Sequence, residues 1–298
     1  MKNENNIYNT KEMESLKSIS TLPTNDVIFH CLFGTKGNEK ITKAFLEKLL
    51  NKEVEEIDLD LNLNLIREHY DDKLGILDVR VKDKNGVNYN IEMQNASSNT
   101  LPERIISYWS RLYNGDLKVG NDYNTLNKTI AILIVNDTIK NLEVIKKFHT
   151  KWNLREETYT EIILTDYLEI HIIELPKYIE SKKSNNNVWL DFLLKPNEIR
   201  GMDAMEDSKM KKELEMVEEA RKKWEEIIAD EKIRDRALRL EIARLDYNTG
   251  MNNAKQEGIK EERELIIKEM LANNFTLEVI SKITKLDIKE IEKIRDNK

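Results

Sequence analysis

The sequence has little of what stabilises small secreted proteins or breaks up a chain. Its 298 residues include one cysteine, four prolines and nine glycines. A single cysteine excludes an intrachain disulfide, and so few prolines and glycines argue against a linker-rich or disordered chain. No apolar run approaches the roughly 20 residues that span a bilayer, and the polar start MKNENNIYNT lacks the apolar stretch of a signal peptide. We therefore expect a cytoplasmic protein that does not associate with membranes.

Motifs for zinc and for nucleotide cofactors are missing as well. The four histidines are scattered without an HxxxH pattern, so we expect no zinc site. No Walker or dinucleotide-binding glycine pattern occurs, so we expect no nucleotide cofactor. Basic residues are not in excess: the net charge is −7, and neither 1–200 nor 201–298 is basic overall. A nucleic-acid partner would need a local basic surface or metal ions, because neutralisation of phosphates supplies most non-specific affinity.

What is present is an alternation of helical and strand patterns. The predicted elements are, in order, a helix capped at 24–26, a helix at 39–51, a strand at 57–66, a hairpin at 76–94, a helix at 98–120, a strand at 128–136 and a strand within 161–175. Up to residue 136 this order is typical of an α/β core with a mixed sheet. Residues 1–20 are polar and are expected to fray.

The second part of the chain is rich in charge. Residues 205–270 are dominated by Glu, Lys and Arg, with apolar residues at alternating three- and four-residue steps, which predicts a long helix with an interrupted coiled-coil seam. That helix either mediates self-association or packs on the core of its own chain. Thr276 and Asp287 are suitable N-caps and predict two short helices in 271–295. Their spacing suits a small helix-turn-helix, which serves either DNA recognition or packing and assembly.

The register of the hairpin ILDVRVKDKNGVNYNIEMQ (76–94) follows from its side chains. A two-residue turn would pair Val79 with Glu92 and mix apolar and polar residues on each face, which is disfavoured. A three-residue loop ending at Gly86, which can adopt the left-handed conformation, puts the apolar residues on one face. That loop also pairs Asp78 with Glu92.

Two carboxylates in this register would repel each other. Directly opposed residues have Cβ atoms about 4.5–5.5 Å apart, and at an effective dielectric of about 20 the repulsion is about 3 kcal/mol. That is enough to raise one pKa by about two units unless a cation compensates. The cation is either Arg80 or Lys82, or a divalent metal ion with oxygen ligands such as Mg²⁺. Hairpin geometry favours neither.

An ordered set of motifs surrounds the hairpin. The pattern D-x₁₃-E-x-Q puts Asp78, Glu92 and Gln94 on consecutive strands after a leading helix. The accompanying segments are DVIFHCLFG (26–34), AFL (44–46), LDV (77–79), NIEMQ (90–94), RIISY (104–108), GNDY (120–123) and IAILIV (130–135). This set resembles the PD-(D/E)XK nuclease superfamily, and within it the recombination-promoting nuclease (Rpn) and transposase family. The resemblance covers about 24–136 and implies a restriction-endonuclease-like α/β core with helices on both faces of a mixed sheet.

The resemblance implies a metal-dependent DNA endonuclease that promotes recombination. By this analogy Asp78 and Glu92 bind Mg²⁺ or Mn²⁺, Asp26 adds a further carboxylate, and Gln94 completes the catalytic set. Gln94 stands where most of the superfamily has a lysine, as in the variant found in this family. A glutamine positions water without deprotonating it, so the metal must lower the pKa of that water.

Four residues are candidate contacts for DNA phosphates: Arg104 and Arg111 on the helix after the hairpin, Lys73 upstream of it, and His30 on the leading helix. The alternatives are ordinary surface arginines and a histidine that packs between helices.

The sequence thus predicts four segments: a polar N-terminal segment (1–23), a nuclease-like domain (24–200), a long charged helix (201–270) and a helix-turn-helix-like tail (271–298). We expect a bacterial or phage-encoded DNA endonuclease that forms a homo-oligomer through 205–270, because two paired sites give double-strand cuts. The competing interpretation is a catalytically inactive nuclease-fold protein that binds DNA or serves oligomeric assembly.

Overall fold

The computed structural model describes residues 9–59, 78–95, 100–115, 117, 122–182, 186–199 and 208–296. The α-helices are α1 (Thr10–Ser20), α2 (Asp26–Phe33), α3 (Glu39–Leu50), α5 (Leu101–Gly115), α6 (Leu175–Ser181), α7 (Val188–Leu194), α8 (Ser208–Ala229), α9 (Glu231–Ala272), α10 (Leu277–Thr284) and α11 (Ile288–Asp296). The strands are β1 (Ile57–Asp58), β2 (Val79–Asp83), β3 (Asn88–Gln94), β4 (Thr129–Val135), β5 (His149–Trp152) and β6 (Leu168–Glu174). Short 3-10 helices lie at Tyr123–Thr125 and Lys140–Leu142.

The described strands form one six-stranded mixed sheet in the order β1-β2-β3-β4-β6-β5. β1, β2 and β3 are antiparallel neighbours, β3, β4 and β6 run parallel, and β5 pairs antiparallel with β6. α5 connects β3 to β4, as a parallel pair requires a crossover. The α/β class and the mixed sheet are confirmed, and the described elements from α2 to β4 follow the predicted order.

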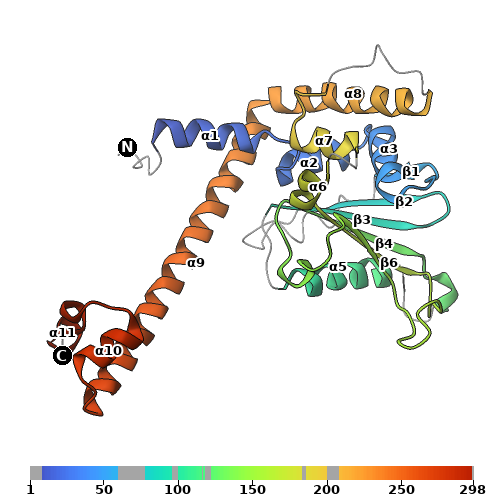
Figure 1. Cartoon of the computed structure of the whole chain (residues 1–298). Helices are drawn as coiled ribbons and strands as arrows, with labels where there is room; N and C mark the ends of the chain where they lie inside the picture. Colours follow the sequence, from blue (N-terminus) through green and yellow to red (C-terminus); the bar gives the residue numbers. More distant parts are fainter. Residues whose placement is uncertain are drawn as a thin grey trace. The chain divides into compact units, whose positions relative to one another are not determined.

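Helices cover both faces of the sheet (Figure 1). α5 lies on one face; α2, α3 and α7 lie on the other, with α8 packed across them. Beneath α5, Leu101 and Ile105 pack against Leu133 of β4. On the opposite side the core is aromatic, and the rings of Phe33 and Phe45 stack with their centroids 4.3 Å apart.

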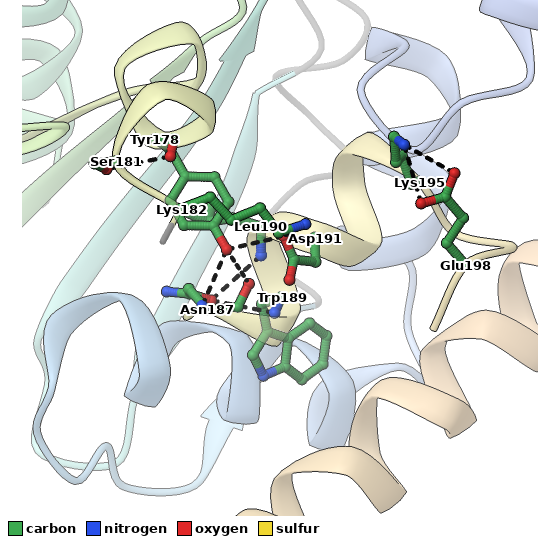
Figure 2. Close-up of polar contacts among 9 residues, drawn as sticks. All are labelled: Tyr178, Ser181, Lys182, Asn187, Trp189, Leu190, Asp191, Lys195 and Glu198. Carbon is green, nitrogen blue, oxygen red and sulfur yellow. Dashed lines mark hydrogen bonds and ion pairs between the residues drawn. The ribbon is translucent and has the colours of Figure 1, made fainter. Parts of the chain in front are cut away.

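A polar network fixes α7 in this aromatic layer (Figure 2). The Asn187 side chain caps the helix by accepting a hydrogen bond from the Trp189 N–H at 3.1 Å. The Tyr178 hydroxyl of α6 accepts from the Asn187 N–H at 3.0 Å and donates to Asp191 at 2.9 Å. The Trp189 ring therefore lies 5.5 Å from that of Phe45 and is fully buried.

The hairpin has the predicted register and the predicted loop. Its pairs include Val79–Ile91, Arg80–Asn90 and Val81–Tyr89. The loop closes through a hydrogen bond from the Gly86 N–H to the Asp83 carbonyl at 2.9 Å, and Gly86 has a φ of +84°. The ladder begins at Val79, and the next position outward in this register sets Asp78 opposite Glu92.

The expectation that residues 1–20 fray is wrong for the helix α1. The side chain of Asn9 accepts from the Glu12 N–H at 3.0 Å, and Glu12 accepts from the Asn9 N–H at 2.8 Å. This reciprocal capping box satisfies two of the free N–H groups of the first turn. Leu16 and Ser20 are buried, which anchors the helix.

Other predicted boundaries need correction. The helix expected at 98–120 ends at Gly115, and only Ile57–Asp58 of the strand expected at 57–66 is observed, because 60–77 lie outside the described residues. The elements β5, α6 and α7 had no counterpart in the sequence prediction. They are four to seven residues long, too short for a periodic pattern to separate them from loops.

The charged segment forms two helices separated by Asp230: α8 ends just before this residue and α9 begins just after it. The Asp230 carboxylate accepts hydrogen bonds from the N–H groups of Lys232 (2.8 Å) and Ile233 (3.2 Å) and so caps the start of α9. α8 buries one face, formed by Leu214, Val217, Ala220, Trp224 and Ile227. This face packs on α2, α3 and α7 of the same chain, so half of the predicted seam belongs to the core.

The chain divides into two compact units, 1–239 and 240–298. In the second unit, α10 and α11 pack on the end of α9 through the buried side chains of Ile267, Ile280 and Ile291. Thr276 is the N-cap residue of α10, as predicted, and Ile283 on the same helix is 61% exposed. No helix in the described part of the chain is long and apolar enough to cross a membrane.

Replacing Gly86 with alanine should lower the free energy of unfolding by about 1–2 kcal/mol, because an L side chain is strained in the left-handed region. The new Cβ would also lie 2.8 Å from Asn127 Oδ1. Urea denaturation measures the change. Gly115→Ala is the control, since a Cβ there meets nothing within 4 Å. An equal loss in both variants would contradict the assigned turn.

Candidate active site

The site residues gather where β3 ends and α2 begins. Asp26 is the first residue of α2. Gln94 is the last residue of β3, and Glu92 lies two residues before it. Asn95 connects the two elements: its amide donates to the Thr24 carbonyl at 2.7 Å and to Asp26 Oδ1 at 3.3 Å. The carboxyl ends of parallel strands are the usual place for ligand sites in α/β sheets.

The parallel pairing of β3 with β4 decides which way the acids point. Glu92 is the partner of Leu133, and Gln94 the partner of Val135, and both β4 residues lie in the cluster beneath α5. The polar face of β3 is therefore covered by α5. Glu92 is only 2% exposed, so the polar face of the hairpin is buried at this position although it lies opposite the apolar face.

Arg104 from the first turn of α5 contacts both polar residues of β3. Its Nη2 atom donates to Glu92 Oε1 and to Gln94 Oε1. The Arg104 side chain is 28% exposed, so the guanidinium reaches the buried carboxylate from the rim of the site. This residue, expected to contact phosphate, instead forms the ion pair of Glu92.

The second acid has an arginine of its own. Asp78 accepts a hydrogen bond from Arg80 Nε at 2.9 Å. In the structure, each acid is therefore paired with an arginine. Arg80, one of the predicted alternatives, pairs with Asp78, and Arg104, from outside the hairpin, pairs with Glu92. Neither pair excludes a metal ion, because each carboxylate retains further lone pairs.

Burial gives Glu92 an unusual acidity. Its pKa is raised to about 7, chiefly by desolvation; Arg104 opposes this rise, and the charges of Asp78 and Asp26 add to it. A carboxyl group with a raised pKa near like charges in a cleft is a frequent feature of functional sites.

His30 connects α2 to the start of β2. It lies one turn after Asp26 and close enough to Asp78 for that residue to act on the pKa of the ring, while the Nδ1 atom of the ring is buried without a hydrogen-bond partner. Burial lowers its pKa, so the ring is neutral. A Cβ on Gly34 would lie 3.0 Å from the ring, which shows how closely the helix end packs on it. His30 thus supports Asp78 from inside the fold.

The remaining candidates lie apart from the acids or outside the described residues. Arg111 is exposed on α5, two turns beyond Arg104. Lys73 lies outside the described residues. The structure thus joins Glu92, Gln94 and Arg104 by direct contacts, and Asp78 and Asp26 lie near enough to Glu92 to raise its pKa.

The donor set of this site suits a hard divalent cation. Glu92 Oε2 is buried and has no hydrogen-bond partner, which leaves a carboxylate oxygen available to a cation. The carbonyl oxygen of Gln94 and the carboxylates of Asp78 and Asp26 are oxygen ligands of the kind that Mg²⁺ prefers. In the arrangement described here, no three Asp, Glu, His or Cys side chains of the described residues converge as a metal-binding group. The ligand types therefore fit a divalent cation, although Arg80 and Arg104 occupy positions beside the acids.

Sequence reasoning missed a second polar cluster at the β5–β6 edge. His149 Nε2 lies 2.8 Å from His171 Nδ1, whose other ring nitrogen is 2.8 Å from Glu169. Lys151 adds an ion pair to Glu169 at 3.1 Å. Burial lowers the pKa of His149 to about 4, so it stays neutral near pH 7. The sequence offers only two histidines 22 residues apart, and this spacing does not predict a contact unless the pairing of β5 with β6 is known.

Comparison with known families matches the model described as "PD-(D/E)XK nuclease family transposase" over residues 23–254. The chain belongs to this family. Searches of the curated proteins and of the solved structures gave no match. The resemblance seen over 24–136 is therefore confirmed, and the PD-(D/E)XK match extends through α8 into α9.

Glu92→Gln should stabilise the metal-free protein at high pH. The folded pKa of about 7 exceeds the ordinary 4.5, so the folded state binds the extra proton and loses stability as pH rises through this window. At 1.36 kcal/mol per unit, the cost above pH 7 is about 3 kcal/mol. Urea denaturation in EDTA should show that gain for Glu92→Gln at pH 8 and little gain near pH 4.

The control is Glu103→Gln, which removes an exposed acid from the position next to Arg104 in α5. It should show no such pH dependence. A Glu92→Gln effect that is constant across this range would contradict the raised pKa.

Proposed function

We propose that this family member is a metal-dependent DNA endonuclease. The observation that carries the proposal is the Glu92 carboxylate, which is 2% exposed and has one oxygen without a partner. A buried carboxylate oxygen without a partner costs stability unless it serves a ligand. Its neighbours Asp78 and Gln94 complete the acidic pattern that the sequence shares with PD-(D/E)XK nucleases.

In this proposal the acids and the amide have separate tasks. Asp78 and Glu92 hold Mg²⁺ or Mn²⁺, with Asp26 as a further carboxylate. The bound ion supplies a water of lowered pKa and stabilises the charge that develops on the phosphate. Gln94 orients the attacking water and takes no proton. His30, which lies beside Asp78, positions that acid from α2.

The substrate side of the proposal is a DNA phosphodiester. Arg111 is exposed on α5 and is available to a phosphate, and Arg104 lies at the rim of the same helix. Lys73 is retained as a phosphate contact from the sequence pattern. We infer from the family resemblance that this cleavage promotes recombination, and from the composition that the protein, bacterial or phage-encoded, acts in the cytoplasm.

A supercoiled plasmid assay with Mg²⁺ or Mn²⁺ tests the proposal. Asp78→Asn and Glu92→Gln keep the shape of each side chain and remove its charge, and each should slow nicking by a factor on the order of 10²–10³. Glu103→Gln on α5 removes an exposed charge beside Arg104 and is the matched control.

The rival proposal is a nuclease fold that binds DNA or assembles without cutting. The arginine partners of both acids and the glutamine in place of a lysine support it. Equal residual nicking by wild type, Asp78→Asn and Glu92→Gln would reject the catalytic proposal in favour of this one.

Self-association, if it uses the charged segment, must use α9 rather than α8. α8 buries its apolar face in its own chain, whereas α9 exposes Tyr247 (55%), Met251 (56%) and Leu265 (60%). We propose that these residues contact a second copy.

The double variant Tyr247→Lys with Met251→Lys should reduce the mass measured by light scattering to that of one chain, because charges in an apolar interface are not compensated. Val144→Lys changes an apolar residue that is 85% exposed elsewhere and is the control. A wild-type protein with the mass of one chain would remove the assembly role.

A further inference from the structure

The contact between Arg104 and Glu92 is incomplete for a structural ion pair. Arginine and carboxylate commonly bind through two parallel N–H···O bonds. Here a single atom, Nη2, bridges Glu92 Oε1 and Gln94 Oε1. Glu92 Oε2 and Arg104 Nε are both buried and both without a hydrogen-bond partner. The guanidinium thus neutralises the acid while leaving one of its oxygens unsatisfied.

The two atoms that Arg104 contacts are the oxygens that the proposed function assigns to a metal ion. A carboxylate oxygen and an amide oxygen on alternate residues of β3 face the same side of the sheet. Hard divalent cations bind such oxygens. A guanidinium offers only N–H donors, so its attraction to this pair is electrostatic and is opposed by any second cation bound there.

We propose that Arg104 is a built-in counter-cation that competes with the divalent metal ion for Glu92 and Gln94. This inference rests on the proposed function, and it adds a residue that sets the metal affinity of the site. Metal binding displaces the guanidinium or repels it from the bridging position, and loss of Arg104 leaves the acid free for the metal.

Arg104 has room to leave the acids. Its side chain is 28% exposed, whereas Glu92 is almost fully buried. The guanidinium carbon lies 5.8 Å from the centre of the Tyr108 ring, one turn further along α5. Arginine stacks favourably on aromatic rings, so the guanidinium already has a contact on its own helix besides the acids. A shift of the guanidinium towards Tyr108 and away from the acids therefore requires no movement of α5.

Binding of Mn²⁺ alone to the full-length protein tests the inference. Electron paramagnetic resonance of free Mn²⁺ gives the affinity, in alkaline buffer that keeps Glu92 ionised. Arg104→Gln should tighten binding about tenfold, equivalent to about 1.4 kcal/mol, which is the size of one hydrogen bond to a charged group. Arg111→Gln removes the same charge from the same helix without touching the acids, and should stay within about twofold of wild type.

Further variants separate this inference from the proposed function. Glu92→Gln should abolish the tight Mn²⁺ site, and Arg104→Gln combined with Glu92→Gln should bind no better. The shift in thermal unfolding midpoint on adding Mn²⁺ gives a second readout, and should be larger in Arg104→Gln than in wild type.

The outcomes are distinct. If wild type binds Mn²⁺ through Glu92 but Arg104→Gln binds it equally or more weakly, the competition is rejected and the proposed metal site stands. Equal tightening by Arg111→Gln would also reject it, since a general field effect would then explain the change. If neither wild type nor Arg104→Gln shows Mn²⁺ binding that depends on Glu92, the metal-dependent function itself fails.

Discussion

Pairing β3 with β4 in parallel turns the polar face of β3 towards α5, and the character of the site follows from that burial. Glu92 shares its face with Leu133, which packs beneath α5. A carboxylate in such a place must be neutralised or must shift its pKa, and here both happen. Arg104 supplies a positive charge from α5, and desolvation still raises the pKa to about 7. The helix that buries the acid is also the helix that compensates it.

The opposite face of the sheet provides the rigidity that such a site needs. Aromatic rings from α2, α3 and α7 pack together there, and α8 covers them. The capped start of α2 carries Asp26, and His30 one turn later lies beside Asp78. The packed aromatic core thus fixes the positions of Asp26 and Asp78, two of the three acids, while its apolar side chains stay on the other face of the sheet.

The hairpin shows how much of this could be predicted from the sequence. Its register follows from keeping apolar residues on one face, and Gly86 supplies the one left-handed residue of the loop. Local patterns also predicted α2, α3 and β4, because α2 is capped by Asn25 and because α3 and β4 are long enough to show a clear pattern. β5, α6 and α7 escaped prediction because they are short. The helix α1 escaped because a polar segment was taken to fray although Asn9 and Glu12 form a capping box.

The sequence by itself determined the order of the described elements from α2 to β4, the hairpin register that sets Asp78 opposite Glu92, and membership of the PD-(D/E)XK nuclease family transposases. These depend on local periodicity, on turn geometry and on the spacing of a few residues, all of which are written along the chain. Only the tertiary structure decided that the polar face of β3 is buried, that Arg104 rather than Lys82 neutralises Glu92, and that α8 belongs to the core. Each of these is a contact between segments far apart in the sequence, and its energy depends on what the fold excludes from water.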